Sequence, residues 1–289
     1  MKKIIAVAVA TAFAIPAYAA DVTVSGDVEY FYKSTDAGAS FDSGDQDVVV
    51  TGSEELANGW SVTASLEMDG NEDGLVSDSK LTIDTGVVTI EVGDANDSAA
   101  RMVDEKSDKS EQGGNGGEGA LATDALHTLS LSMSPIENLM IAYSKSTSND
   151  DSDATTVDIN SYAIQYTMMG VTLAYGTTEV EGQDEDVATL SAAYAAGPVS
   201  IGYDATSNEG NVEGDDSTNI GIAYKYGPGN IFIETGEQKD FSAGTKTETT
   251  AMGVSYAIGS MNTYALQNKV KTSATAEDDQ TIIGVEYKF

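Results

Sequence analysis

Apolar and polar side chains alternate along most of the chain with a period of two residues. Between Trp60 and Asp69, Val62, Leu66 and Met68 lie on one face, and polar or acidic side chains lie on the other. This is the period of a β-strand. The same analysis predicts sixteen strands, near residues 21–33, 46–56, 59–69, 78–85, 87–93, 126–134, 138–147, 157–168, 170–180, 187–196, 198–207, 217–226, 230–238, 247–258, 260–270 and 278–289. Most span about 9–12 residues, a length that suits a tilted strand crossing the hydrocarbon layer of a membrane.

The connections between these strands alternate strictly between short and long. Short turns fall at 57–59, 85–86, 135–138, 169–170, 197–198, 227–229 and 259–260, and long loops at 34–45, 70–77, 94–125, 148–156, 181–186, 208–216, 239–246 and 271–277. A soluble β-sandwich has no reason to collect its long loops at one end. The pattern therefore predicts an all-β protein, a transmembrane antiparallel β-barrel of sixteen strands with short periplasmic turns and long extracellular loops.

The tyrosines agree with this topology. Tyr30, Tyr32, Tyr143 and Tyr175 fall towards the outer interface, and Tyr166, Tyr194, Tyr224, Tyr226 and Tyr287 towards the periplasmic one. Nearly all share the face of the neighbouring apolar residues, so two aromatic belts facing lipid are expected. A preference of tyrosine for strands would give a weaker version of the same pattern.

The first residues have the pattern of a targeting segment. Lys2 and Lys3 precede an apolar run from Ile4 to Ile15, and Ala17-Tyr18-Ala19 has the spacing of a cleavage site. We predict a cleaved signal peptide over 1–19, because the run is too short for a retained anchor helix. No later segment approaches the roughly 20 apolar residues that a membrane-spanning helix needs.

Composition excludes several classes of function. The chain has 14 Lys plus Arg against 47 Asp plus Glu, for a net charge of -33, and loss of Lys2 and Lys3 would leave 12 bases and a net charge of -35. A surface this acidic excludes general binding to nucleic acid, which needs clustered basic side chains. With no cysteine and a single histidine, His127, the chain has no disulfide, thiolate or two-imidazole metal site.

Two segments resemble a known family. The segment from Gly52 to Trp60 and the strand carrying Glu67 resemble the second hairpin of Gram-negative general diffusion porins, and the terminal Phe289 resembles the signal read by the barrel assembly machinery. The resemblance implies an outer-membrane homotrimer of sixteen-stranded barrels that passes small hydrophilic solutes. It also implies contact with outer-membrane lipid and lipopolysaccharide. The mature barrel would cover 20–289, with 94–125 as its pore-constricting loop.

The alternation predicts which charges of the wall face the pore, and the resemblance implies that the charges of the constricting loop face it as well. On the wall these are Asp27, Glu29, Lys33, Glu67, Lys80, Asp84 and Glu91, with Asp204, Glu234 and Glu286 on later strands; on the loop they are Asp94, Asp97, Arg101, Asp104, Glu105, Asp108 and Glu111. Members of the family usually set a cluster of arginines against loop acids, whereas this chain has one arginine, and it lies in the loop. Negative fixed charge in a narrow aqueous passage concentrates cations, so we predict a cation-selective pore. Loop acids that point to bulk solvent would instead leave the pore nearly indifferent.

Other motifs give weaker evidence of a binding or catalytic site. Gly114-x-Gly116-x-x-Gly119 matches a dinucleotide fingerprint but lacks the flanking strand and helix, and His127 has no evident nucleophile or orienting partner. Pairs of carboxylates are expected by chance at this composition, so a glycosidase dyad is not indicated. Asp69, Asn71 and Asp73 match half of an EF-hand loop without its closing glutamate, which leaves open a looser calcium site or an ordinary polar loop tip.

The sequence therefore predicts a passive porin that is not an enzyme and needs no cofactor. The alternative, from a different class, is an exported acidic β protein that binds divalent cations or a surface partner in a structural or adhesive role.

Overall fold

The computed structural model describes residues 21–70, 78–93, 98–103, 106–109, 127–147, 158–180, 185–210, 215–240, 244–273 and 278–289. The predicted signal peptide, 1–19, lies outside these residues. The described elements are β1 (Asp21–Thr35), β2 (Gly38–Ser43), β3 (Asp47–Glu55), β4 (Ser61–Asp69), β5 (Asp78–Asp84), β6 (Val88–Gly93), α2 (Ser98–Val103), β7 (His127–Ile136), β8 (Leu139–Thr147), β9 (Asp158–Met168), β10 (Val171–Val180), β11 (Glu185–Ala196), β12 (Val199–Gly210), β13 (Asp215–Tyr226), β14 (Gly229–Asp240), β15 (Thr245–Ile258), β16 (Met261–Thr272) and β17 (Asp278–Lys288).

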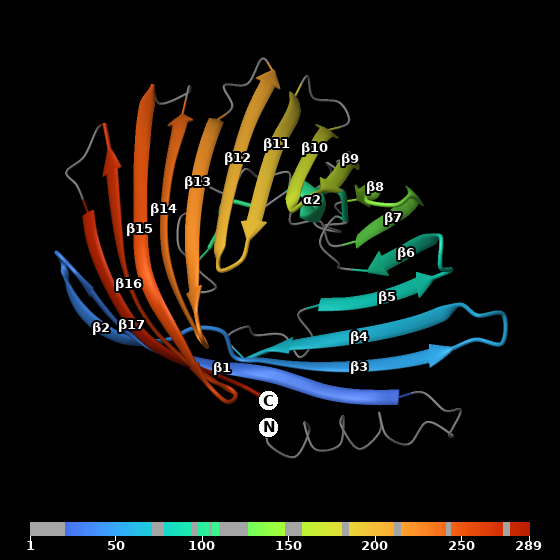
Figure 1. Cartoon of the computed structure of the whole chain (residues 1–289), viewed down its shortest axis with the longest axis horizontal. Coiled ribbons are helices and arrows are strands. Elements are labelled where there is room, and N and C mark those ends of the chain that lie inside the picture. Colours follow the sequence, from blue (N-terminus) through green and yellow to red (C-terminus); the bar gives the residue numbers. More distant parts are fainter. Residues whose placement is uncertain are drawn as a thin grey trace, which may run out of the picture.

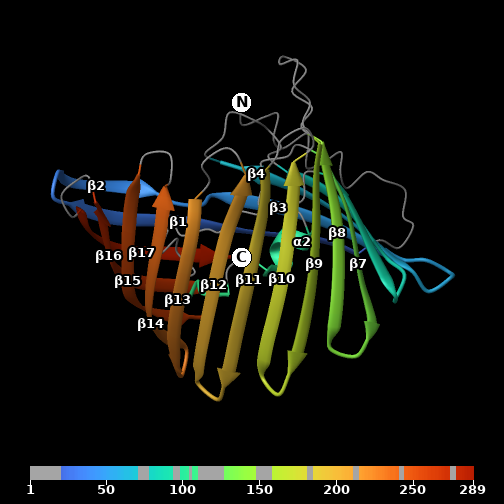
Figure 2. The ribbon, with the colours of Figure 1, turned by 90° about the horizontal axis from the view of Figure 1, so that it is seen from above.

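The strands form one closed antiparallel sheet. From β3 to β17 each strand pairs with the next along the chain, and β17 pairs with β1 from Asp27↔Lys288 to Thr35↔Gln280, which closes the barrel (Figure 1). In Figure 2 the hairpins from β7 to β14 stand side by side, with their short turns at one end. The prediction of an antiparallel β-barrel is confirmed.

The second strand differs from the prediction. We expected a loop over 34–45, but β2 occupies Gly38–Ser43. It pairs with residues 30–35 of β1, while β3 pairs with residues 21–26 of the same strand. Both segments therefore belong to one strand, interrupted at 44–46, and the seventeen strand segments build a wall of sixteen strands. The side chains of β2 are mostly small or polar, so the segment shows no clear alternation of apolar and polar positions. Its place in the sheet is fixed instead by backbone hydrogen bonds to β1.

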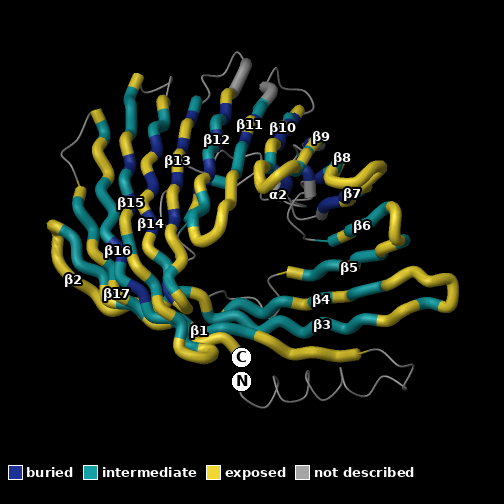
Figure 3. The backbone as a smooth tube through the Cα atoms, viewed as in Figure 1, coloured by how far each residue is buried: buried dark blue, intermediate teal, exposed yellow. Residues whose placement is uncertain are grey.

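The barrel has the reverse of a soluble protein's polarity. Leu173 and Ile231 are each 52% exposed on the outer face, whereas Ser144 and Ser191 on the inner face are 0% exposed. Figure 3 shows exposed and buried positions alternating along strands such as β13 and β14. Apolar side chains outside and hydroxyls inside suit a wall between lipid and a polar lumen. Among the described residues, no helix has the length and apolar character needed to cross a membrane.

The short turns are tight where the backbone requires it. Met169 and Gly170 join β9 to β10 with φ of 53° and 81°. Positive φ at both central residues gives the turn the twist of the strands that it connects. The prediction of a two-residue turn at 169–170 is confirmed.

Candidate functional site: the lumen and its inward loop

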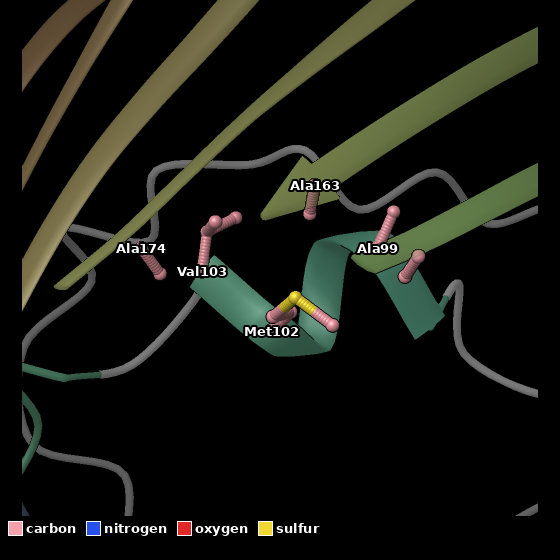
Figure 4. Packing of buried hydrophobic residues seen from close by; sticks show 6 residues of the cluster. Ala99, Met102, Val103, Ala163 and Ala174 are labelled. Atoms are coloured by element: carbon pink, nitrogen blue, oxygen red, sulfur yellow. The ribbon is translucent and has the colours of Figure 1, made fainter. Parts of the chain in front are cut away.

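A short helix from the loop after β6 packs against the inner wall of the barrel. Ala99, Met102 and Val103 of α2 are buried, and they contact inward-facing alanines of β8, β9 and β10: Ala142, Ala163 and Ala174 (Figure 4). The Ala99 backbone N–H donates a hydrogen bond of 3.3 Å to Ser144 Oγ. Alanines at these positions leave room for a helix beside the sheet, so this part of the loop lies within the barrel.

The loop then follows the wall across β12, β13 and β14. The Ser107 backbone N–H donates a hydrogen bond of 2.5 Å to Asp204 Oδ2, and the Lys109 N–H donates one to Glu234 Oε1. Asn230 Nδ2 donates to the Lys109 carbonyl at 3.3 Å. A carboxylate that accepts from a backbone amide makes one of the stronger hydrogen bonds available to a protein. Asp204 and Glu234 are therefore anchors of the loop.

Two glycines let the loop backbone approach this closely. A Cβ at Gly202 would lie 1.4 Å from the Lys106 carbonyl oxygen, and one at Gly221 would lie 1.7 Å from that of Ser107. Neither position has a positive φ, so the glycines are needed for space rather than for backbone conformation. The wall of β12 and β13 is shaped to receive residues 106–107.

Lys109 brings a positive charge to the anchors. Its Nζ donates to the Lys106 carbonyl, and the carboxylates of Asp204, Asp108 and Glu234 lie near enough to favour its charged form. Burial has the larger effect, and it lowers the pKa of the Lys109 ammonium below its ordinary value. The anchor region therefore combines buried carboxylates with a partly desolvated lysine.

The inner face of the opposite wall carries directly opposed acids. Glu67 on β4 pairs in register with Asp78 on β5, Asp47 on β3 with Asp69 on β4, and Glu29 on β1 with Glu286 on β17. Like charges that face each other across strands repel, and water and counter-ions reduce that cost. We call these three pairs the acidic rows. Lys288, whose Nζ lies 3.0 Å from Glu286, offsets part of the charge of the acidic rows, and on the same wall Lys80 Nζ lies 3.5 Å from Glu91.

A tyrosine spans the seam where the two ends of the barrel meet. The Tyr264 hydroxyl on β16 donates a hydrogen bond of 2.6 Å to Glu29 Oε1 on β1, passing over β17. Its ring occupies the space above Gly284, where a Cβ would lie 2.3 Å from the ring. Tyr264 also belongs to an inner apolar cluster with Ala223, Phe232, Ala251 and Leu266. The lumen wall thus has apolar patches that strand alternation alone did not predict.

The predicted site residues divide into two groups. Asp27, Glu29, Lys33, Glu67, Lys80, Asp84 and Glu91 all lie on β1, β4, β5 or β6, at positions that alternate with the exposed apolar side chains. Asp84 stands at the end of β5, where its carboxylate accepts a hydrogen bond of 2.7 Å from the Gly86 N–H. Of the loop residues, Asp108 is exposed, and Arg101 lies in α2. Asp94, Asp97, Asp104, Glu105 and Glu111 fall outside the described residues, as does the side chain of Arg101.

The predicted calcium ligands lie only partly within the described residues. Asp69 ends β4, whereas Asn71 and Asp73 lie beyond the residues that the structure describes. Within its described part, no group of three or more His, Cys, Asp or Glu residues is placed to hold a metal ion.

Asp204 and Glu234 lie in a different environment from the one that strand alternation predicts. Their inward direction follows from alternation, but the prediction set them in the water of the lumen. They are only 5% and 3% exposed, because residues 106–109 cover them. Strand alternation gives a side chain's direction and says nothing of a loop that folds back over it. A glycine on the same inner face of the neighbouring strand, as at Gly221, is the one sequence signal of that approach.

Comparison with known proteins agrees with this architecture. The family model for Gram-negative porins matches residues 6–289. Among solved structures, a loop-deletion mutant of the outer membrane protein OmpT of Vibrio cholerae has a TM-score of 0.77 at 14% identity, and covers 94% of this chain and 100% of its own. An anion-selective porin from Comamonas acidovorans has a TM-score of 0.74 at 15% identity, with 93% and 100% covered.

A mutant of the Rh. blastica porin has a TM-score of 0.70 at 16% identity, with 93% and 100% covered. No match was found among curated proteins. At these identities the likeness shows the fold, while the family match extends over nearly all of the chain. Together with the closed barrel and its apolar outer face, that match shows that the chain belongs to the Gram-negative porin family of outer-membrane barrels.

Proposed function

We propose that this barrel is a cation-selective pore through which small hydrophilic solutes and ions diffuse passively. The observation that carries the proposal is the set of acidic rows, Glu67 with Asp78, Asp47 with Asp69 and Glu29 with Glu286. A packed interior would not tolerate such pairs, because uncompensated buried carboxylates are very costly. An aqueous lumen tolerates them, since mobile cations gather beside them.

The expected selectivity follows from the electrostatics of a narrow passage. Fixed negative charge on a low-dielectric wall raises the local concentration of cations and repels anions, and the effect weakens as salt screens it. On the other side of the lumen, Asp204 and Glu234 are engaged by the loop backbone. They contribute less to the field in the water than exposed carboxylates would. Among the described residues of the wall, we therefore expect the acidic rows to contribute most to the charge that an ion meets.

The fold by itself leaves the sign of selectivity open. The Comamonas acidovorans porin, whose fold is similar, is described as anion-selective. Side chains on the wall and the loop, rather than the barrel, must then set the sign. In this chain, acids outnumber bases by 47 to 14, and the acidic rows lie on the inner face.

The loop over 94–125 is proposed as the constriction. Its described residues, 98–103 and 106–109, lie against the inner wall, which supports a role in narrowing the passage. Asp108 is exposed on this segment, and the loop acids are a second place where selectivity can arise.

Three partners are proposed for assembly. One solved structure similar in fold is described as a trimer form of OmpT, which supports a homotrimer. Lipopolysaccharide is proposed as a lipid of the surrounding leaflet, and the barrel assembly machinery as the reader of Phe289. In the folded barrel the Phe289 N–H and carbonyl both bond to Gly26, at 2.9 and 3.1 Å, so the terminal residue itself closes the seam.

Planar-bilayer recordings on variants would locate the residues that set the ion selectivity. Replacing Asp47, Glu67 and Asp78 together with Asn, Gln and Asn should move the potassium-to-chloride permeability ratio towards one. The matched control is Glu179→Gln, which removes an exposed carboxylate from the outer face of β10 and should leave the ratio unchanged.

The neutralised loop variant, Asp104→Asn, Glu105→Gln and Asp108→Asn, tests the other location. If the potassium-to-chloride permeability ratio fell only in the loop variant, the acids of the wall would not set the selectivity. A correctly folded barrel that conducts no ions at all would contradict the pore and favour the structural or adhesive alternative.

A further inference from the structure

The inner face of β1 carries an acid, an apolar side chain and a base in succession. Glu29, Phe31 and Lys33 alternate with exposed tyrosines of the outer face, so all three point into the lumen. At this level β1 lies between β17 and β2 (Figure 1). On β17, Glu286 pairs in register with Glu29, and Ile282 with Lys33. We call these five residues the bipolar strip.

The acidic end of the strip is held in place and keeps its charge. The Tyr264 hydroxyl donates a hydrogen bond of 2.6 Å to Glu29 Oε1, which fixes the direction of that carboxylate. Lys288 Nζ lies 3.0 Å from Glu286, but Asp27 stands across from Lys288 in register. Three carboxylates therefore face one lysine, and this end of the strip is negative.

Apolar side chains form the middle of the strip. Phe31 and Ile282 are half-buried, and they pack on the inner apolar cluster that contains Tyr264 and Leu266. In a lumen filled with water, the exposed parts of Phe31 and Ile282 are in contact with that water. A solute that places an apolar group against them removes this surface from water, which favours its binding.

The basic end of the strip is a lysine without a carboxylate partner. Among the described residues, no carboxylate lies within ion-pair distance of Lys33, whereas Lys80 and Lys288 on the same wall are both paired. Asp42 on β2 stands diagonal to Lys33, and its carboxylate accepts a hydrogen bond of 2.6 Å from the Ser40 hydroxyl. The Lys33 ammonium is therefore available to an anionic group of a solute, which would compete with Asp42.

The distance between the two ends sets the length of a suitable ligand. Glu29 and Lys33 are four residues apart on an extended strand, which separates their Cα atoms by about 13–14 Å. An extended tripeptide spans about 10–11 Å, and both side chains can lean towards its ends. On the neighbouring wall, by contrast, a polar side chain, Ser65, faces Lys80 in register.

We propose that the bipolar strip binds short zwitterionic peptides with an apolar side chain as they pass through the barrel. The strip meets solutes only in a water-filled lumen, so this site rests on the pore proposed above. The ammonium of the peptide would lie beside Glu29 and Glu286, its carboxylate beside Lys33, and its apolar side chain in the middle of the strip. Charge-assisted hydrogen bonds at both ends would orient the peptide. An organic cation would gain nothing from Lys33, and a sugar would gain nothing from either end.

The test measures peptide binding through the potassium current that the folded full-length barrel carries in a planar bilayer. Alanyl-leucyl-alanine should reduce this current, and the concentration dependence gives an apparent dissociation constant. Lys33→Gln should raise that constant about two- to five-fold, the range for one exposed ion pair. The matched control, Lys225→Gln, removes an exposed inward lysine from β13 and should leave the constant unchanged. Heat-modifiable gel migration checks that each variant is folded.

Three further arms separate the contributions of the peptide's groups. Converting its carboxylate to an amide should weaken binding and abolish the difference between the parent and Lys33→Gln. Glycine in place of the central leucine should weaken binding about five-fold, because the apolar contact is lost. Asp42→Asn should tighten binding, since it removes a negative charge close to the peptide carboxylate.

The outcomes distinguish this site from the pore itself. Equal constants in the parent and Lys33→Gln would overturn the bipolar strip as the site. Weaker binding in Asp42→Asn would show that the ligand is held as a cation, and would overturn the zwitterion. Both results would leave a barrel that conducts potassium, so the proposed pore would stand. A folded barrel without conductance would contradict the pore and, with it, the site.

Discussion

At the scale of single residues, the most informative pair is Asp204 and Ser107. The carboxylate is buried on the wall, and it accepts a hydrogen bond of 2.5 Å from a loop amide 97 residues away. A buried carboxylate is tolerated where it is hydrogen-bonded and near a cation, and Lys109 supplies that charge. The contact therefore fixes where the loop crosses the lumen.

Replacing Asp204 with Ala should release this part of the loop. The Ser107 amide would lose its acceptor, at a cost of about 1–3 kcal/mol, so its hydrogen exchange should accelerate about ten-fold or more. Asp204→Asn keeps an oxygen at the same place and should retain most of the protection. Identical exchange rates in the parent and Asp204→Ala would show that the anchor does not hold the loop.

At the scale of elements, strand alternation predicted most of the wall to within a few residues. The predicted strand 46–56 is β3 at Asp47–Glu55, and the predicted strand 78–85 is β5 at Asp78–Asp84. The β2 segment was missed because its fold depends on backbone pairing with β1 rather than on its own side chains. Helix α2 was missed because six residues carry too little periodicity, and its stability comes from packing on distant alanines.

The seam between β16, β17 and β1 depends on one glycine. Gly284→Ala places a methyl group where the Tyr264 ring now lies, and should displace the ring and break its bond to Glu29. Overpacking of this kind costs about 1–3 kcal/mol, so the temperature at which the barrel loses its heat-modifiable migration should fall.

Gly52→Ala is the matched control, since nothing lies within 4 Å of a Cβ built there. Tyr264→Phe, which removes only the hydroxyl, should have a smaller effect than Gly284→Ala. If Gly284→Ala were as heat-stable as the parent, the seam would not depend on the tyrosine.

At the scale of the whole molecule, the sequence predicted the direction in which a side chain points better than it predicted the surroundings of that side chain. Alternation gave the inward side of Glu67 and Asp204 alike, but only the fold shows that Asp78 faces the first and a loop covers the second. The contact between Ser107 and Asp204 joins residues 97 apart in the chain, and the facing of Glu67 and Asp78 depends on the register between two strands, so alternation within one strand encodes neither. The distribution of exposed charge in the lumen therefore follows from the folded barrel and not from strand alternation alone.

The zero-current potential of the unmodified protein in a potassium chloride gradient tests the central claim most directly. If the acidic rows govern a water-filled passage, the potential should have the sign for potassium at low salt. It should shrink at molar salt, where the Debye length is about 3 Å. A potential of the chloride sign at low salt would contradict the account.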